Sequence, residues 1–401
     1  MKFRNSTRQF WLSLVAMLAT GMLVAAFPIT ATAAQNLVYT ISNNTNTNQN
    51  SVIALVNDGN GNLSPVTGSP FLTGGTGVGP GNMTDAQWDS DDETIINAAG
   101  TLLFAVNGHT NTIAAFTINS DGSLTPVPGS PFPSGGTQPA SIAYKDNALG
   151  NGNSIMVVAN KDSDPLQTQT APNYMTFTVS PTGVLTANAA GLFMLPAGAS
   201  PAQVIYRRGG TAGFFGVEFL AGTVTSYRLT RNGAATITNQ LALPQPNPVA
   251  VGGVLHPTVK GLYLTLPADH EVGVYGYDST GKLSAVGTAS NQGIAVCWAT
   301  VNAAGTRLYT SETPSGTIEV YDITNPKVPV MLQYFTVSGT LPQPAHLRLD
   351  VTGQFLYALD RNGVLHVINV AADGTLSESI TPYNLGLPTG TVPLGLAVLS
   401  K

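Results

Sequence analysis

The sequence predicts an all-β fold: a seven-bladed β-propeller with four-stranded blades, in which the C-terminal strand closes the N-terminal blade. Three observations predict it, namely a repeated two-strand unit, a recurring glycine turn and a short apolar run that opens each unit. The composition agrees, because 43 glycines and 27 prolines among 401 residues leave little room for long helices. Hydrophobic residues make up 43% of the chain, which supports a large core and excludes a disordered protein.

The two-strand unit is clearest in residues 97–118 and 302–323, which align without a gap. Both segments consist of a turn, a strand, a polar loop and a second strand. Within the second copy, residues 317–321 alternate between polar and apolar side chains, which is the pattern of a half-buried strand.

A glycine turn follows the second strand of most units. Asn-Gly and Asp-Gly sequences supply the positive φ that a tight hairpin needs. The copies are Gly61–Leu63, Gly122–Leu124, Gly183–Leu185, Gly281–Leu283 and Gly374–Leu376, with a weaker one at Asn232-Gly233 and a replacement at Asn325–Lys327. Turns that recur roughly every 50 residues predict one four-stranded blade for each turn, and hence seven blades.

Each unit opens with a proline or glycine turn and a short apolar run. Such runs are Pro139–Tyr144, Pro201–Tyr206, Pro248–Gly253, Ile294–Ala299 and Pro344–Leu349. The same run ends the chain at Pro393–Leu399, whereas residues 37–41 match the second strand of a unit. The last strand is therefore expected to pair with residues 37–41, which removes an open sheet edge. A β-solenoid would not need this offset.

The N-terminus has the pattern of a secretory signal peptide over residues 1–34, which leaves 35–401 as the propeller. Three basic residues precede an apolar stretch at 10–27, Pro28 interrupts it, and Ala31-Thr32-Ala33 provides a cleavage site. The protein is then exported, periplasmic or extracellular, with no membrane attachment after cleavage. An uncleaved membrane anchor is the alternative, although about 18 apolar residues are marginal for a membrane span.

Charge excludes several classes of partner and cofactor. Charged residues make up only 9% of the chain, compared with roughly 25% in typical domains, and the net charge is −5. No basic run is present, so nucleic acid and anionic membrane surfaces are poor partners. The sequence also lacks a phosphate-binding glycine loop, a nucleophile elbow and a cysteine pair, so it predicts no organic cofactor.

The long loops are expected on one face of the propeller, where the inner strands begin. They are residues 42–51, 74–93, 161–173 and 268–271. Long loops on a rigid scaffold often carry function, although solvated insertions are the alternative. We therefore expect a small-molecule or carbohydrate ligand at the propeller mouth of a monomeric protein.

Two sequence features resemble a known family. They are the copies of Gly-Ser-Pro-Phe at 68–71 and 129–132, and the segment 308–321 around Leu-Tyr-Thr-Ser. The repeat resembles the lactonase-type seven-bladed propellers, which include 6-phosphogluconolactonase-like proteins, and the related Tyr-Val-Thr-Asn repeats. The resemblance covers essentially all of residues 35–401. It implies a propeller fold, with lactone hydrolysis as the expected activity.

Active members of that family combine a Pro-x-His on an inner strand with a Glu four residues after the Tyr of the next strand, and add arginines. Pro344-Ala-His346 matches the first element, but Arg361 occupies the Glu position after Tyr357. Acids lie one residue earlier in several units, which on a strand points the side chain to the opposite face. The resemblance thus implies an incomplete or remodelled catalytic set, with His346, Arg348, Asp360, Arg361 and Glu312 as candidates.

In the catalytic interpretation, His346 is the acid–base group, Asp360 or Glu312 orients it, and Arg348 or Arg361 stabilises an oxyanion. His346 and Arg348 are two residues apart on one strand and so share a face. The alternative is a buried histidine beside a structural arginine–carboxylate pair.

The densest group of acids comprises Asp85, Asp89, Asp91, Asp92 and Glu93. An oxygen-rich loop of this kind suits Ca²⁺, with Asp89, Asp91 and Asp92 as candidate ligands. No glycine-centred twelve-residue calcium loop is present, and a solvated acidic loop is the alternative.

Two functions from different classes therefore remain open. One is an exported hydrolase of an unphosphorylated lactone or similar small ester. A phosphorylated lactone fits less well, because its dianion needs several cations and the expected ligand face offers only Lys161, Arg348 and Arg361. The other is a non-catalytic binding or protein-interaction propeller.

Overall fold

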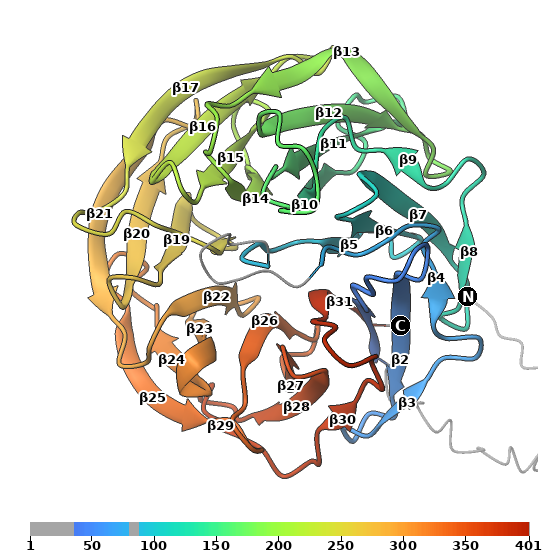
Figure 1. Ribbon diagram of the computed structural model, residues 1–401. Coiled ribbons are helices and arrows are strands. Elements are labelled where there is room, and N and C mark those ends of the chain that lie inside the picture. Colours follow the sequence, from blue (N-terminus) through green and yellow to red (C-terminus); the bar gives the residue numbers. More distant parts are fainter. Residues whose placement is uncertain (1–35, 80–87, 401) are drawn as a thin grey trace, which may run out of the picture. The chain divides into compact units, whose positions relative to one another are not determined.

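The computed structural model describes residues 36–79 and 88–400, which form seven antiparallel sheets around a central space (Figure 1). Each sheet is one blade, and its strands follow one another outward from the centre. The predicted all-β seven-bladed propeller is thereby confirmed. The predicted signal peptide, residues 1–34, and Asp85 lie outside the described residues, so export stays a prediction.

In the first four blades, the strands run in order from the inner edge outward. Blade 1 contains β31 (Leu394–Ser400), β1 (Asn36–Ile41), β2 (Ser51–Asn57), and an outer strand in two parts, β3 (Leu63–Pro65) and β4 (Phe71–Leu72). Blade 2 contains β5 (Thr94–Ile96), β6 (Leu102–Asn107), β7 (Thr112–Ile118), β8 (Leu124–Pro126) and β9 (Phe132–Pro133). Blade 3 contains β10 (Pro139–Lys145), β11 (Ser154–Asn160), β12 (Asn173–Val179) and β13 (Leu185–Met194). Blade 4 contains β14 (Pro201–Tyr206), β15 (Gly213–Glu218), β16 (Thr223–Leu229) and β17 (Ala235–Ala242).

The remaining three blades follow the same order. Blade 5 contains β18 (Gly253–Leu255), β19 (Gly261–Leu266), β20 (Glu271–Tyr277) and β21 (Leu283–Ser290). Blade 6 contains β22 (Val296–Val301), β23 (Arg307–Glu312), β24 (Thr317–Asp322) and β25 (Val330–Thr336), with the 3₁₀ turn η1 (Thr313–Ser315) between β23 and β24. Blade 7 contains β26 (Pro344–Leu349), β27 (Phe355–Asp360), β28 (Val364–Val370), β29 (Leu376–Ser377) and β30 (Tyr383–Asn384).

Tyrosines on second strands explain why the repeated unit and the glycine turn occur together. Tyr39 on β1 donates a hydrogen bond to the carbonyl of Gly122, at the β7–β8 turn of the next blade, over 2.9 Å. Tyr309 on β23 does the same to Gly374 of blade 7 over 3.1 Å. Gly122 has a φ of 88°, and a Cβ there would lie 2.6 Å from a methyl group of Leu37. The turn therefore requires glycine both for its backbone and for the contact between blades.

The ring closes as the sequence predicts. β31 pairs antiparallel with β1, with Tyr39 opposite Ala397 and Leu37 opposite Leu399. The last strand of the chain is thus the inner strand of the blade that the first strand began. Within the described residues, no helix has the length and apolar character needed to cross a membrane.

Candidate functional site

The channel segment, residues 88–93, lies in the centre of the ring and leads into β5 (Figure 1). Contacts with three inner strands hold it there. The Ile142 amide of blade 3 donates to the Asp92 carbonyl over 3.0 Å, and the Asp91 amide donates to the Ala202 carbonyl of blade 4 over 3.3 Å. The Trp298 indole of blade 6 donates to the Ser90 carbonyl over 2.7 Å. The acidic run is therefore fixed among the inner strands instead of forming a solvated loop.

His346 and Arg348 on β26 meet the channel segment from blade 7, as their spacing of two residues on one strand allows. His346 Nδ1 lies 3.3 Å from Asp91 Oδ1 and 3.6 Å from Glu93 Oε2. Arg348 Nη2 donates to Asp91 Oδ1 over 3.0 Å and to Asp92 Oδ1 over 2.5 Å. Two groups that the sequence suggested separately, the catalytic candidates and the acidic run, thus form one site.

Arg361 joins the same centre from the end of β27. Its Nη2 donates to Asp89 Oδ1 over 2.7 Å, and its guanidinium lies 5.0 Å from the Trp298 ring centroid. The His346 ring lies 5.0 Å from the same indole, and Lys161 Nζ donates to the Asp89 carbonyl over 2.8 Å. Arg361 and His346 thus both pack against the Trp298 ring, and each pairs with a different acid, Asp89 and Asp91 respectively.

Charges in this centre shift the ionisation of the acids in opposite directions. Burial alone would raise the pKa of Asp91, but the Arg348 charge and the His346 hydrogen bond outweigh it and lower that pKa. Burial and the neighbouring Asp91 charge raise the pKa of Asp92, against the attraction of Arg348. Burial also raises the pKa of Glu93. The arrangement keeps Asp91 ionised and makes it harder for its neighbours to ionise.

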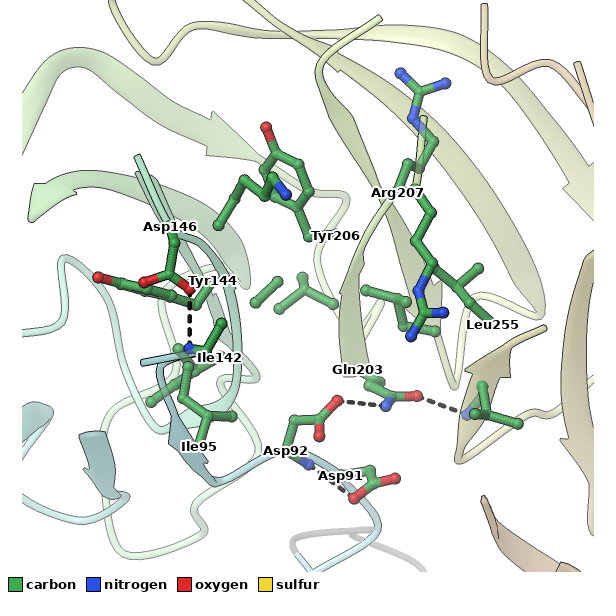
Figure 2. A pocket seen from close by; sticks show the side chains of 18 of the residues that line it. Asp91, Asp92, Ile95, Ile142, Tyr144, Asp146, Gln203, Tyr206, Arg207 and Leu255 are labelled. Atoms are coloured by element: carbon green, nitrogen blue, oxygen red, sulfur yellow. Dashed lines mark hydrogen bonds between the residues drawn. The ribbon is translucent and has the colours of Figure 1, made fainter. Parts of the chain in front are cut away.

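A cavity of about 930 Å³ ends on this cluster (Figure 2). Asp91, Asp92, Arg348 and Gln203 line its inner end, and Gln203 Nε2 donates to Asp92 Oδ2 over 2.7 Å. The side chains of Asp92 and Arg348 are 27% and 21% exposed, so the ion pair faces the open space. The walls combine apolar side chains, among them Ile95, Ile142 and Leu255, with polar and charged ones such as Lys145, Asp146 and Arg208. Such a cavity with a few convergent polar groups is typical of small-molecule sites.

The cavity opens on the face opposite the long loops. Its outer part is lined by residues 145–148 and 206–212, which connect the first and second strands of blades 3 and 4. The loop lengths predicted the ligand mouth at the other face, where the inner strands begin. Ligand binding at that other face stays a prediction.

Asp360 and Glu312 do not join His346, contrary to the catalytic interpretation. Asp360 accepts a hydrogen bond from the Gln343 amide over 2.6 Å and lies 3.5 Å from His366 Nε2. In the pairing of β26 with β27, Asp360 is opposite Pro344 and not opposite His346. Glu312 accepts hydrogen bonds from the side chains of Thr310, Asn291 and Thr317 within blade 6.

The carboxylates of Asp89, Asp91 and Asp92 do not converge on one point either. Arg361 holds Asp89, whereas Arg348 and Gln203 hold Asp92. Among the described residues, the one group of three or more potential ligands with converging atoms is Asp91, Glu93 and His346, whose ligand atoms lie within 4.8 Å of one another. Calcium binding by the acidic run stays a prediction that this geometry does not favour.

Gln203, Glu93 and Trp298 were not singled out from the sequence. A signal for Gln203 was nevertheless present. Pro201-Ala-Gln203 and Pro344-Ala-His346 open two units in the same way, and the third residue of each reaches the acids of the channel segment. Glu93 belonged to the acidic run, but nothing local distinguished it from its neighbours.

No protein-family profile matches the chain, and no curated protein matches its sequence. Solved structures do resemble it. The periplasmic gluconolactonase PpgL of Pseudomonas aeruginosa superposes with a TM-score of 0.68 at 14% identity, over 91% of this chain and 99% of that one. A candidate 6-phosphogluconolactonase of Bacteroides fragilis superposes with a TM-score of 0.67 at 14% identity, over 93% and 100% of the two chains. At this identity the likeness shows a lactonase-like propeller fold and nothing finer.

Proposed function

We propose that this protein is an exported hydrolase of the lactonase type, acting on an unphosphorylated lactone or a similar small ester in the central cavity. One observation carries the proposal: a carboxylate and a guanidinium, from Asp92 and Arg348, both face the inner end of a cavity of about 930 Å³. A base and an oxyanion-stabilising donor at one end of a cavity are the minimum that ester hydrolysis requires.

The reaction follows from the positions of these two groups. Asp92 accepts a proton from a water molecule while the water oxygen adds to the substrate carbonyl carbon. Arg348 donates hydrogen bonds to the carbonyl oxygen, on which negative charge develops. When the C–O bond of the ring breaks, Asp92 returns the proton to the departing oxygen, and the product is a hydroxy acid. Gln203 and Asp91 hold Asp92 and Arg348 in place through their hydrogen bonds.

The same end of the cavity argues for an uncharged substrate. Two carboxylates, Asp91 and Asp92, face a single guanidinium there, so a phosphate dianion at this end would be repelled. The walls combine apolar and polar side chains, which favours a substrate that has both hydrocarbon and hydroxyl portions. Export is supported by the N-terminal sequence pattern, and one structurally similar protein is periplasmic. We place the protein in the periplasm or outside the cell, working as a monomer.

A second candidate, a non-catalytic binding propeller, rests on one specific observation. Arg348 Nη2 already donates to both Asp91 and Asp92, and both oxygens of Asp92 accept hydrogen bonds. A ligand could therefore occupy the cavity and leave this ion pair intact, so that binding occurs without turnover.

The test is turnover of the mature chain on a panel of unphosphorylated lactones and small esters, together with Asp92→Asn. Loss of a working general base lowers the rate by about 10²–10⁴. The matched control is Asp146→Asn, because Asp146 lines the same cavity but hydrogen-bonds to the Ala98 amide, away from Arg348. Full turnover in Asp92→Asn would exclude the assigned base. Saturable binding of a panel member without any turnover would establish the binding protein instead.

A further inference from the structure

Next to the cavity, Asp91, Glu93 and His346 surround a buried point. The proposed hydrolysis gives no role to this point, to Glu93 or to His346, and uses Asp91 only to hold Arg348. The exposed fractions of Asp91, Glu93 and His346 are 1%, 0% and 0%, and their potential ligand atoms lie within 4.8 Å of one another. His346 Nδ1 faces both acids, at 3.3 Å from Asp91 Oδ1 and 3.6 Å from Glu93 Oε2. Glu93 and His346 come from the inner edges of blades 2 and 7, so the fold brings them together from distant parts of the sequence.

One oxygen of Glu93 is left without a hydrogen bond. The Ser90 hydroxyl donates to Glu93 Oε1 over 2.7 Å, whereas no donor among the described residues reaches the buried Oε2, which is the oxygen nearer to His346. His346 Nε2 also has no hydrogen-bond partner in the described part of the chain. Buried polar atoms are nearly always paired, so an orphaned carboxylate oxygen facing an imidazole indicates a missing ligand.

We propose that Asp91, Glu93 and His346 bind a divalent transition-metal ion, with Zn²⁺ as the best fit. In tetrahedral zinc sites with bonds of about 2.0–2.2 Å, neighbouring ligand atoms lie about 3.3–3.6 Å apart. The two distances from His346 Nδ1, 3.3 and 3.6 Å, match this spacing. Ca²⁺ instead takes six to eight oxygen ligands, and this set offers a nitrogen and few oxygens.

The surrounding residues are those that a metal site needs. Ser90 orients Glu93 through Oε1 and leaves Oε2 for the ion, while Arg348 and the Asp92 amide hold Asp91. Asp91 also lines the cavity, so the ion has a side of entry. The competing arrangement is an empty site in which His346 Nδ1 contacts the carboxylates of Asp91 and Glu93 directly.

The test is direct metal binding by the mature chain, without any substrate. We expect one Zn²⁺ per chain, measured by elemental analysis of purified protein and by calorimetric titration after treatment with a chelator. Co²⁺ in place of Zn²⁺ should give the visible absorption of a four-coordinate site. Glu93→Gln and His346→Gln should weaken Zn²⁺ binding by more than the roughly 10–100-fold that loss of a residue supporting the ligands produces. The matched control is Glu218→Gln, a glutamate on β15 that is 1% exposed.

Binding of less than one tenth of an equivalent, or an unchanged affinity in Glu93→Gln, would overturn the proposal. If Glu93→Gln does not fold, Ser90→Ala tests the same point, because it removes only the hydroxyl that orients Glu93. Ser90→Ala should bind Zn²⁺ about 10–100-fold more weakly than the wild type, and equal affinity would again overturn the proposal. Turnover plays no part in these measurements, so their outcome does not depend on the proposed hydrolysis.

Discussion

Two groups of buried and half-buried carboxylates in this propeller, within the blades and in the central channel, are accommodated in two different ways. Within the blades, Glu218 accepts hydrogen bonds from the hydroxyls of Tyr174, Thr223, Thr225 and Tyr227. Glu312 accepts its bonds from Asn291, Thr310 and Thr317. All of these partners are uncharged. In the central channel, by contrast, Asp89, Asp91 and Asp92 each face an arginine.

The difference separates a structural role from a functional one. The two glutamates satisfy their oxygens with neutral donors from nearby strands, including Tyr174 of the adjacent blade for Glu218. Burial raises the pKa of Glu218 to about 7 and that of Glu312 to about 8. The central acids need cations from β26 and from the end of β27, far away in the sequence, and they lie next to a cavity. Buried charge that is paired across blades is costly to assemble, so it points to function.

Removing the central cation should have the largest effect on stability. Arg348→Met leaves the buried Asp91 and the half-buried Asp92 without their guanidinium, and breaking a buried pair such as Asp91–Arg348 costs up to about 3–5 kcal/mol. We expect that loss in the free energy of unfolding, measured by urea denaturation, together with loss of any lactone turnover. The control is Arg228→Met, because Arg228 is exposed on β16 and its substitution should change stability by less than about 0.5 kcal/mol. Equal free energies of unfolding for the two variants would mean that the central ion pair does not stabilise the folded protein.

Most of the fold could be predicted because the evidence for it is local and repeated. Residues 97–118 and 302–323 contain β6–β7 and β23–β24, and the final apolar run is β31. Each blade repeats the same pattern of strand, turn and apolar run, so an error in interpreting one copy does not change the predicted fold class or number of blades. The inner strand of blade 5 shows where the pattern is least precise: the apolar run begins at Pro248, but β18 spans only Gly253–Leu255.

The site was predicted only in part, because its contacts are not local. His346 was identified from the family resemblance and Arg348 from its spacing to His346, but both were assigned to the wrong acids, Asp360 and Glu312. Their actual partner, Asp91, is more than 250 residues away in a loop that the repeat does not describe. One sequence signal did point to this pairing. The chain has only 9% charged residues but concentrates acids in residues 85–93, and acids that become buried are rarely without a cation beside them.

The neutral networks within the blades should respond to pH. The pKa of Glu312 is raised from 4.5 to about 8, so the folded protein keeps this proton over a range in which the unfolded chain has lost it. The contribution to stability is full below pH 4.5 and is lost as the pH rises through 8. Glu312→Gln stays neutral throughout and should flatten the decline by up to about 1.4 kcal/mol per pH unit.

Thermal unfolding of the wild type and Glu312→Gln from about pH 5 to 9 measures this effect. Glu218→Gln serves as a second case with a lower midpoint, because the pKa of Glu218 is raised only to about 7. Parallel curves for the wild type and both variants would show that the two glutamates are ionised in the folded state, in contrast to their raised pKa values.

The smallest expected effect comes from the closing strand, which touches the central cluster. Gly395 on β31 has a φ of 64°, and a Cβ there would lie 2.8 Å from the Thr94 amide nitrogen and 3.1 Å from Glu93 Cβ. Gly386 has nearly the same φ, 67°, but open space around it. Both alanine variants carry the left-handed backbone cost of about 1–2 kcal/mol, so their difference isolates the contact with Thr94 and Glu93. We expect Gly395→Ala to be less stable than Gly386→Ala by about 1–2 kcal/mol, as overpacking usually costs.

Gly395→Ala should also bind Zn²⁺ more weakly, because Glu93 must move, while the pH dependence of stability due to Glu312 stays unchanged. If Gly395→Ala and Gly386→Ala have the same stability and the same metal affinity, the position of Glu93 does not depend on ring closure. The carboxylates of the central channel and those within the blades would then differ in the charge of their partners but not in how their positions depend on the surrounding packing.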